Sequence, residues 1–423
     1  MPASPDERRQ PDAQGRPAGT VTRLRPDQIG GRRVTPDAAP LGLSVPPPLS
    51  LYVHLPWCLA KCPYCDFNSH EHPRDGVPEA RYVDAVLADL DAALPAIWGR
   101  SVQTIFIGGG TPSLFSPDSI ERLLSAIRAR VRLVADAEIT LEANPGTYDA
   151  TRFEGFAQAG VNRLSIGVQS FDDQALVALG RRHDRRQALA AIESAVRHFK
   201  TFNLDLMFAL PGQDPAASQA DLAQALAFEP PHLSCYHLTL EPGTPFAKRP
   251  PPLPDDDMAA RMHDAIVSDL EAAGYEHYEV SAFARAGHAC RHNLNYWTFG
   301  DYLGLGAGAH SKLSSYQGIF REVRQRHPSR YMAAALGTGD PIASREPVEN
   351  GERPFEFMLN ALRLAQGVPA ALFAERTGLG PMALAEALET ARARGLMDAD
   401  PTRLRPTPLG WRYLNDLLVL FVR

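Results

Sequence analysis

The 423-residue sequence lacks the long apolar segments that would place a chain across a membrane. No apolar run approaches the roughly 20 residues that a membrane-spanning helix needs. The first ten residues, MPASPDERRQ, carry charges but no apolar segment follows them, which argues against a secretory signal. We therefore expect a cytoplasmic protein.

An excess of basic residues is also absent, because 43 Lys and Arg are outnumbered by 49 Asp and Glu. The resulting net charge of −6 does not support a general nucleic-acid-binding protein, so we expect no nucleic-acid partner. With 44% hydrophobic and 22% charged residues, the composition is that of an ordinary globular chain. Its length is enough for about two or three domains.

Cysteine is scarce, since the chain has five, and a disulfide framework in so long a sequence would be sparse. Cys58, Cys62 and Cys65 lie together in WCLAKCPYCDF, in the pattern C-x3-C-x2-C, while Cys235 and Cys290 stand apart. Clustered thiols in a reducing compartment are more typical of metal ligands than of disulfides.

Three interpretations of the clustered thiols remain open at this point. They could be buried core residues, although a tight loop spacing disfavours this. They could hold structural zinc with His54 or His70 as the fourth ligand, although no second C-x2-C is present. They could hold a 4Fe–4S cluster, which four thiolates would close and three would leave with one open iron. In that case the missing fourth cysteine indicates a site that holds an exogenous ligand.

The chain divides into four segments by composition and periodicity. Residues 1–48 are rich in proline and arginine and predict a disordered tail. Residues 49–274 alternate strand and helix patterns, and residues 275–349 form a connecting region that contains HNLNYW and the glycine-rich YLGLGAGAHS. Residues 350–423 read as three short helices, then a strand–turn–strand and a helix, which suggests a winged-helix-like module that packs against protein rather than DNA.

Six strands are expected in the alternating segment, and together they predict an α/β fold with a parallel sheet, closed or open. The expected strands are LSLYVHL (chiefly 50–55), VQTIFIGGG (102–110), AEITLEANPG (137–146), NRLSIGVQS (162–170), FNLDLMFALPG (202–212) and HLSCYHLTLEPGT (232–244).

Chemistry in such sheets collects at the carboxyl ends of the strands, and several polar residues lie there. Gly108 to Thr111 form a glycine-rich turn, which alone is weak evidence for ligand binding. Glu142 could be a solvated residue or an acceptor for hydroxyl or ammonium groups, and Gln169 can both donate and accept. Arg181 could pair with a carboxylate, and Asp205 lies among apolar neighbours, where a charge must be paired or occupied.

The C-x3-C-x2-C loop after the first strand resembles the signature of the radical S-adenosylmethionine family. Together with YVHLPWC, GGGTPS, GVQSF and DLMFALPGQ, it is similar to the branch that contains oxygen-independent coproporphyrinogen III oxidases and related haem chaperones. The resemblance extends from about residue 50 to the C-terminus. It implies a partial parallel (β/α)6-type barrel with a smaller C-terminal domain.

The resemblance also implies the cofactors and the residues that hold them. Cys58, Cys62 and Cys65 would bind a 4Fe–4S cluster whose open iron chelates the methionine part of S-adenosylmethionine. The matching cofactor-contacting positions are Tyr52, Gly108, Gly109, Gly110, Thr111, Glu142, Gln169, Arg181 and Asp205. In most members of the family, reductive cleavage of the cofactor yields a deoxyadenosyl radical.

Two features separate the chaperones from the oxidases within this branch. The oxidases carry a further cysteine where this chain has Phe67, and the chaperones have phenylalanine. The chaperones also carry H-N-x-x-Y-W, here His292 to Trp297, which is linked to haem binding. His292 could be a haem ligand, with Cys290 as a weaker rival, or part of a packed, hydrogen-bonded turn.

The resemblance therefore implies a haem chaperone that delivers its cargo to haem-requiring client proteins. The membrane, where respiratory enzymes assemble, is one expected place of delivery. The alternative is a radical enzyme similar to coproporphyrinogen III oxidase, so enzymatic activity stays undecided. A structural zinc protein with a winged helix is a third, less favoured class. The oligomeric state is open, a homodimer included.

Overall fold

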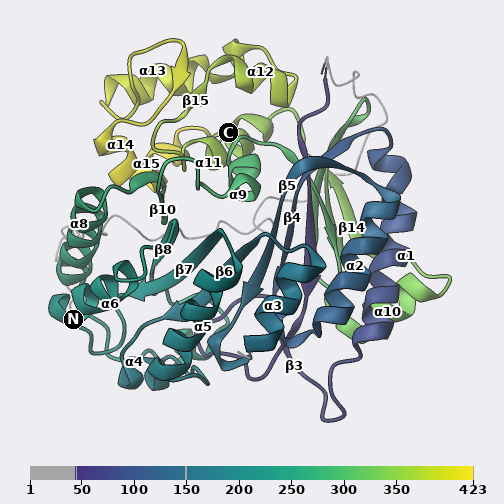
Figure 1. Cartoon of the computed structure of the whole chain (residues 1–423). Coiled ribbons are helices and arrows are strands. Elements are labelled where there is room, and N and C mark those ends of the chain that lie inside the picture. Colours follow the sequence, from purple (N-terminus) through teal and green to yellow (C-terminus); the bar gives the residue numbers. More distant parts are fainter. Residues whose placement is uncertain (1–42, 44, 148–149, 423) are drawn as a thin grey trace, which may run out of the picture.

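The computed structural model describes residues 43, 45–147 and 150–422, and Figure 1 shows them as one large sheet covered by helices. The tail expected over residues 1–48 lies largely outside the described residues. The main sheet of the described part has twelve strands in the order β14-β13-β12-β11-β1-β4-β5-β6-β7-β8-β10-β9. Its central part holds the six strands that the sequence predicts.

The six central strands run parallel, each beside the next in the sequence. They are β1 (Leu49–Leu55), β4 (Ser101–Gly109), β5 (Arg132–Ala143), β6 (Arg163–Gln169), β7 (Thr201–Phe208) and β8 (His232–His237). Their core-facing side chains are apolar because helices cover that side, as in α/β folds generally. The expected parallel, partial-barrel core is therefore confirmed.

The helices that cover the outer side of the sheet begin and end where the sequence places signals. They are α1 (Glu79–Ile97), α2 (Pro117–Arg130), α3 (Ala150–Ala159), α4 (Asp173–Ala178), α5 (Arg185–His198), α6 (Pro215–Leu226) and α8 (Asp256–Ala272), whereas the short α7 (Pro245–Lys248) packs against the cysteine loop. Ser116 caps α2 by accepting a hydrogen bond from Ser119 N at 3.2 Å, and Pro117 occupies its first turn. Gly160 follows α3 with φ of 98°, a conformation that favours glycine.

Side chains alternate between the two faces of each strand, so every second residue points to the inner face of the curved sheet. On β1, Leu51 and Val53 are fully buried in the core. Tyr52 stacks on Phe106 of β4 with ring centroids 6.3 Å apart, and Ser50 accepts a hydrogen bond from Thr104. We call the face that carries these last residues the inner face.

In the sequence, residues 275–349 connect the parallel strands to the C-terminal segment. In space, they add strands to both edges of the same sheet. β9 (Glu276–Glu279) and β10 (Ala282–Ala284) add antiparallel strands beside β8. After α9 (Arg291–Trp297), β11 (Asp301–Leu305) pairs parallel with β1 on the other edge. The remaining elements there are β12 (His310–Ser315), β13 (Gly318–Arg324), α10 (Pro328–Leu336) and β14 (Ile342–Pro347).

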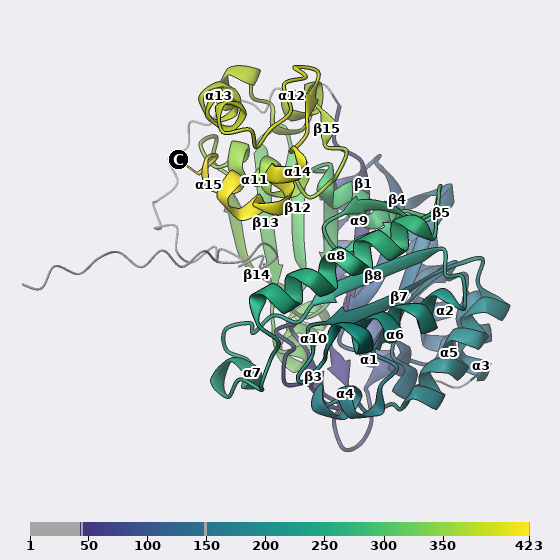
Figure 2. The ribbon, with the colours of Figure 1, turned by 90° about the vertical axis from the view of Figure 1, so that its left-hand side faces the viewer.

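The C-terminal segment forms a smaller unit above the sheet in Figure 2, and its apolar core also includes Tyr278, Phe299 and Ile319 of the preceding region. It contains the three expected short helices, α11 (Arg353–Ala361), α12 (Ala371–Thr377) and α13 (Ala385–Ala393). The expected strand–turn–strand is reduced to one bridge between Met397 and Pro406. The reason is that β16 (Arg403–Leu404) pairs instead with β15 (Val368–Pro369), before α14 (Pro408–Arg412) and α15 (Leu414–Val419).

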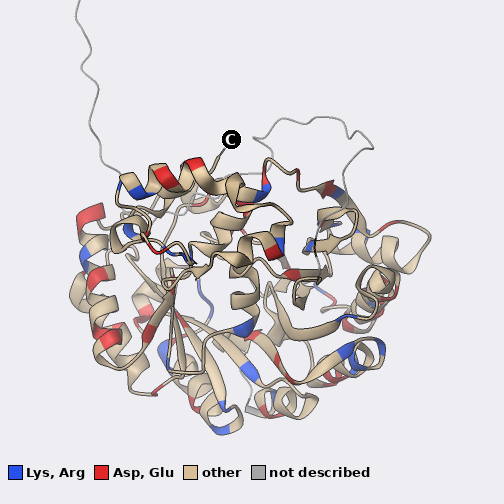
Figure 3. Cartoon of the chain, turned by 90° about the horizontal axis from the view of Figure 1, so that it is seen from above, with Lys and Arg blue, Asp and Glu red and all other residues tan. Residues whose placement is uncertain are grey.

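The surface and helices agree with the composition. Figure 3 shows acidic and basic residues interspersed over the face viewed from above. Within the described ranges, no helix combines the length and apolar character that crossing a membrane requires.

Candidate functional site

The three clustered cysteines lie on the loop that follows β1 at its carboxyl end. The loop begins at β2 (Trp57–Cys58), which pairs parallel with β3 (His70–Glu71), and Cys65 N donates to Cys62 O at 3.1 Å. Cys58, Cys62 and Cys65 are free thiols and half-buried. The core-cysteine interpretation does not fit side chains that remain partly exposed on a loop.

Burial raises the pKa of the Cys58 thiol, and a hydrogen bond with Thr111 partly offsets the effect. Burial likewise raises the pKa of the Cys65 thiol. Hydrogen bonds with the backbone N–H of Phe67 and the hydroxyl of Ser69 offset part of this rise. A bound metal would reverse this balance because it stabilises the thiolate directly. The donor set therefore suits a metal group that supplies its own positive charge.

In the described part of the chain, no three His, Cys, Asp or Glu side chains converge on a position for a single metal ion. A cubane cluster does not need such convergence, because each thiolate binds a different iron atom of the cube. Thiolates are the usual ligands of such clusters, so Cys58, Cys62 and Cys65 fit the 4Fe–4S group that the sequence predicts.

The glycine run is packed tightly against the cysteine loop. Gly110 N donates to Leu55 O at 2.9 Å, and Thr111 N donates to Trp57 O at 2.8 Å. A Cβ atom on Gly110 would lie 2.6 Å from Trp57 O. Gly109 has φ of 124°, and a Cβ atom there would lie 2.7 Å from the His54 ring. Glycine is thus required by close approach, which a simple turn would not explain.

Glu142, near the carboxyl end of β5, and Asp205, within β7, form a half-buried acidic pair. Burial, and then the charge of Asp205, raise the pKa of Glu142 to about 8, although Gly109 N donates to Glu142 Oε2 at 3.0 Å. Burial also raises the pKa of Asp205. Hydrogen bonds to its carboxylate from Asn203 Nδ2 at 2.7 Å and Ser165 Oγ at 3.3 Å lower the pKa in part. Such a pair favours a ligand with ammonium or hydroxyl groups, as S-adenosylmethionine has.

Arg181 reaches back to the cysteine loop from the segment after α4. Its Nη1 lies 3.8 Å from Cys62 Sγ, and its Nη2 donates to Gly167 O at 2.7 Å. Gln169 ends β6 with φ of 70°, where the register of β6 shifts against β7. A left-handed backbone at a residue other than glycine is strained, and such strain clusters at ligand sites. The structure therefore brings Arg181 and Gln169 to the same strand ends as the cysteines.

Tyr52 approaches this group from the inner face of β1. Its hydroxyl lies 2.9 Å from His54 Nδ1, and burial, then the charges of Glu142 and Tyr82, raise its pKa above the usual range. His54 Nε2 donates to Asn68 O at 2.9 Å, so the histidine is held between the two. Tyr52 therefore faces the acidic pair as a neutral hydroxyl.

A small cleft opens beside the cysteine loop and includes residues that the sequence analysis missed. It is lined by Leu59, Ala60, Cys62, Thr111, Asn144, Gly146, Thr147, Gly180, Arg181 and Arg182. Asn144 shapes one wall by accepting a hydrogen bond from Gly146 N at 3.0 Å. Its position two residues after Glu142, in an Asn-Pro turn at a strand end, was a signal that could have identified it.

His292 lies on α9, against the inner face of the sheet and away from the cysteine loop (Figure 1). Its Nδ1 is 2.7 Å from Thr104 Oγ1 and its Nε2 is 2.8 Å from Tyr296 Oη. The residue is 1% exposed, and burial, then the charge of Arg163, lower its pKa to about 3. In this arrangement both ring nitrogens are hydrogen-bonded, as in the packed alternative, and haem ligation by His292 stays a prediction.

Cys290, the rival haem ligand, is buried at the start of α9. Its Sγ lies 3.6 Å from Glu138 Oε1, and burial raises the pKa of the thiol to about 12. A protonated, enclosed thiol is a poor metal ligand. The structure thus makes α9 a packed element that closes one end of the inner face.

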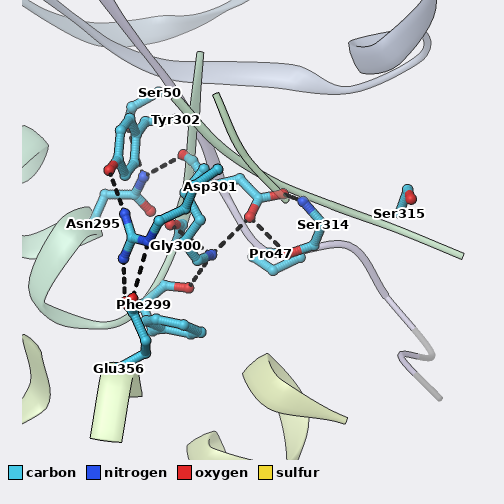
Figure 4. A network of polar contacts seen from close by, with 12 residues as sticks. Pro47, Ser50, Asn295, Phe299, Gly300, Asp301, Tyr302, Ser314, Ser315 and Glu356 are labelled. Carbon is cyan, nitrogen blue, oxygen red and sulfur yellow. Dashed lines mark hydrogen bonds and ion pairs between the residues drawn. The ribbon is translucent and has the colours of Figure 1, made fainter. Parts of the chain in front are cut away.

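A buried polar network fixes α9 to the neighbouring strands (Figure 4). Asp301 at the start of β11 is fully buried and lies 2.9 Å from Lys312 Nζ and 2.9 Å from Arg100 Nη1. Burial alone would raise the pKa of Asp301, but Lys312 and Arg100 lower it below its usual value. Asn295 of α9 donates to Ser50 Oγ at 2.9 Å and to Asp301 O at 2.8 Å.

The same network reaches the C-terminal unit. Arg321 of β13 pairs with Glu356 of α11 and donates to Tyr302 Oη at 3.2 Å. Lys312 Nζ also lies 4.2 Å from the centre of the Phe299 ring. These contacts hold α9, the β11–β13 edge and the C-terminal unit together as one packed region.

Comparison with known families and proteins agrees with this arrangement. Residues 52–220 match the radical SAM superfamily, and residues 348–413 match the HemN C-terminal domain. The chain is 48% identical over 378 residues to the heme chaperone HemW of Escherichia coli (strain K12), covering 89% of this chain and 98% of that protein. It is 39% identical over 328 residues to the mitochondrial radical S-adenosyl methionine domain-containing protein 1 of Bos taurus, covering 75% and 74% of the two chains.

A solved structure with the same fold is the radical SAM enzyme coproporphyrinogen III oxidase (HemN) from Escherichia coli. The two structures superpose with a TM-score of 0.76 over 89% of this chain and 90% of that one, at 23% identity. This likeness confirms the fold that the resemblance implied. The chain therefore belongs to the radical SAM superfamily and, within the branch that includes HemN, to the family of the heme chaperone HemW.

Proposed function

We propose that the protein is a haem chaperone that binds haem and delivers it to haem-requiring proteins. The observation that carries the proposal is the 48% identity to the Escherichia coli heme chaperone HemW over 98% of that protein. The related heme chaperone HemW of Haemophilus influenzae, at 46% identity over 98% of its length, supports the same assignment.

The strand-end site supports a 4Fe–4S cluster on Cys58, Cys62 and Cys65 and S-adenosylmethionine beside it. Glu142 and Asp205 would accept hydrogen bonds from the cofactor, with Arg181 and Gln169 orienting polar groups nearby. The glycine run supplies close backbone approach. When bound, the cluster and cofactor supply one-electron chemistry. In the proposed role they regulate haem transfer or assembly rather than oxidise a porphyrin.

Phe67 supports the chaperone over the oxidase alternative. Its side chain is 53% exposed at the position where the sequence resemblance places an additional cysteine in the oxidases. Its backbone carbonyl accepts a hydrogen bond from Lys61 Nζ at 2.9 Å, so the loop here is closed by protein contacts. The likeness to HemN is a likeness of fold. A shared fold does not determine the reaction, so the role of this chain has to be argued from its own side chains.

The proposed partners are haem and haem-requiring clients, with respiratory enzymes at the membrane among the expected recipients. We further propose that the protein acts in the cytoplasm. We also propose that the protein forms a homodimer, and light scattering would test this.

The deciding experiment measures haem binding and porphyrinogen turnover on one anaerobic preparation with its cluster intact. We expect haem to bind, and coproporphyrinogen III to remain unchanged with S-adenosylmethionine and reductant present. Transfer of bound haem to an apo-cytochrome, followed by absorbance, tests delivery. Decarboxylation of coproporphyrinogen III would replace the proposal by the oxidase alternative, and failure to bind haem would remove it.

A further inference from the structure

Two neighbouring strands of the sheet end in residues with left-handed backbones. Gln169 at the end of β6 has φ of 70°, and Ala209, directly after β7, has φ of 57°. Neither residue is glycine, so each conformation costs free energy that the surrounding contacts have to offset. Both lie at the strand ends that form the proposed cofactor site together with the cysteine loop. The contacts that hold them in place are therefore important for that site.

The left-handed backbone of Gln169 belongs to a β-bulge. Along β6, Gly167 pairs with Asp205 and Gln169 pairs with Leu206, so two residues of β6 advance against one of β7. A bulge re-aims the side chains around it. Here the Gln169 side chain lies over Gly167, because its Nε2 atom would be 3.0 Å from a Cβ atom placed on that glycine. Gln169 is thereby next to Arg181, whose Nη2 donates to Gly167 O at 2.7 Å.

A carboxylate of α6 holds the chain directly after Gln169. Asp221 is 6% exposed and accepts hydrogen bonds from Ser170 Oγ at 2.7 Å and from Phe171 N at 2.7 Å. Ser170 Oγ in turn accepts a hydrogen bond from Asp172 N at 3.0 Å. Ser170 and Phe171 are buried as well, so water cannot easily take the place of the carboxylate. These bonds fix the two residues that follow the bulge.

The same carboxylate is also connected to the end of β7. Gln213 Nε2 donates to Asp221 Oδ2 at 3.4 Å, and Gln213 Oε1 accepts a hydrogen bond from Leu210 N at 3.1 Å. Leu210 directly follows Ala209, so one side chain links the second left-handed residue to Asp221. A buried carboxylate is costly unless it is hydrogen-bonded, and these bonds come from the segments that follow the two strands. Asp221 therefore keeps the bulge of β6 in a fixed position against β7.

Helix α6 has other residues that begin it and pack it. Asp214 caps its N-terminus by accepting a hydrogen bond from Ala217 N at 2.8 Å, and Leu222 and Ala225 are buried in the main core. For packing alone, an apolar side chain at position 221 would serve better than a carboxylate, because it carries no cost of burying a charge. The hydrogen bonds to the strand ends explain why the residue is acidic.

We propose that Asp221 is a positioning residue for the S-adenosylmethionine site, where it holds Gln169 in the bulge at the end of β6. The inference rests on the proposed function, in which Gln169 orients polar groups of the cofactor. Asp221 acts through Ser170 and Phe171 and does not contact the cofactor itself. Gln213 supports it by connecting the carboxylate to the end of β7.

The test measures S-adenosylmethionine affinity by calorimetry on cluster-loaded protein. Asp221→Ala should lose about tenfold in affinity, the loss expected when one hydrogen bond to the cofactor is no longer made. Asp221→Asn should keep most of the affinity, because its amide oxygen can still accept from Phe171 N and its N–H groups can donate to Ser170 Oγ. The matched control is Asp214→Ala, which removes the exposed cap of the same helix. It should lower stability and leave the affinity unchanged.

A double-mutant cycle shows whether Asp221 acts through Gln169. In a Gln169→Ala background, Asp221→Ala should change the affinity by less than about twofold, because the side chain that it positions is already absent. The full tenfold loss in that background would overturn the positioning role. Circular dichroism and iron analysis check that each variant is folded and carries its cluster. If Asp221→Ala does not fold, Ser170→Ala removes one of the two bonds and should lose about threefold in affinity.

The outcomes separate the inference from the proposed function. If the wild type binds no S-adenosylmethionine, the cofactor site of the proposed function is overturned, and the inference with it. If the wild type binds the cofactor and folded, cluster-loaded Asp221→Ala keeps its affinity, the inference alone is overturned. Wild-type affinity in Ser170→Ala has the same meaning where that variant takes the place of Asp221→Ala.

Discussion

The two ends of the inner face are built from similar residues but differ in how far their polar groups are satisfied. Toward the carboxyl ends of the strands, Glu142 and Asp205 lie half-buried, and the charge of Asp205 helps to raise the pKa of Glu142. At the other end, Asp301 has two cationic partners, and His292 has both ring nitrogens hydrogen-bonded. The first end is prepared for a ligand, whereas the second is complete without one.

This difference shows why residue type alone is a poor guide to a site. A buried carboxylate costs free energy unless it is paired, so an incompletely paired one indicates a missing partner. A histidine whose two nitrogens are occupied has its role already. In this structure the HNxxYW motif packs against the neighbouring strands, and its role in haem binding stays a prediction.

The largest expected effect is at the unsatisfied end, where Cys62→Ala should abolish the 4Fe–4S cluster. The three thiolates each hold one iron, and removal of one leaves too few ligands. Iron and acid-labile sulfide, with the visible absorption band, provide the measurement. Cys235→Ser is the control and should keep a full cluster, because Cys235 is buried in the core. A full complement in Cys62→Ala would refute the ligand set.

At the satisfied end, Asp301→Ala should lower the free energy of unfolding by about 3–5 kcal/mol, because Lys312 would be left as a buried, unpaired charge. Urea denaturation followed by circular dichroism measures the change. Asp136→Ala removes an exposed ion pair with Arg291 and should cost about 0–1 kcal/mol. Similar losses in the two variants would show that the Asp301 network does not hold the region.

Glu142 should make the protein without cofactor less stable as the pH rises. Its pKa is raised to about 8 in the folded state from 4.5, so the folded state retains a proton that the unfolded state has lost. Stability then falls with pH between these values and levels off above pH 8. Glu142→Gln should flatten this decline, which thermal unfolding between pH 5 and pH 8.5 measures. An unchanged slope would contradict the raised pKa.

Asp205→Asn should weaken S-adenosylmethionine binding by about ten- to 100-fold, because a charge-assisted acceptor is worth roughly 1.5–3 kcal/mol. Calorimetry on cluster-loaded protein gives the affinity, and iron analysis confirms that the cluster is retained. Glu121→Gln, exposed on α2, is the control with unchanged affinity. Wild-type affinity in Asp205→Asn would count against the cofactor site.

The smallest effect concerns His292. His292→Ala should cost about 1–3 kcal/mol of stability, since Thr104 and Tyr296 lose buried hydrogen-bond partners. Cluster content and haem affinity should remain at wild-type values if α9 is a packing element. A large loss of haem affinity in a stable variant would reverse the comparison between the two ends.

The sequence by itself determined the central fold and most of the cofactor site. Apolar strands such as LSLYVHL and VQTIFIGGG, separated by helical patterns, specify a parallel sheet because each strand must be buried on both faces. Parallel strands bring their carboxyl ends to one edge, so the sequence alone groups Glu142, Gln169 and Asp205 with the cysteine loop.

Only the tertiary structure decided the rest, because those features depend on contacts between distant segments. No local sequence pattern in residues 275–349 indicates that β9 and β11 join opposite edges of one sheet. The HNLNYW motif likewise does not predict the hydrogen bond between His292 Nδ1 and Thr104 Oγ1, which is 188 positions away in the sequence. Long-range packing determines which polar groups are satisfied, and a local pattern does not contain that information.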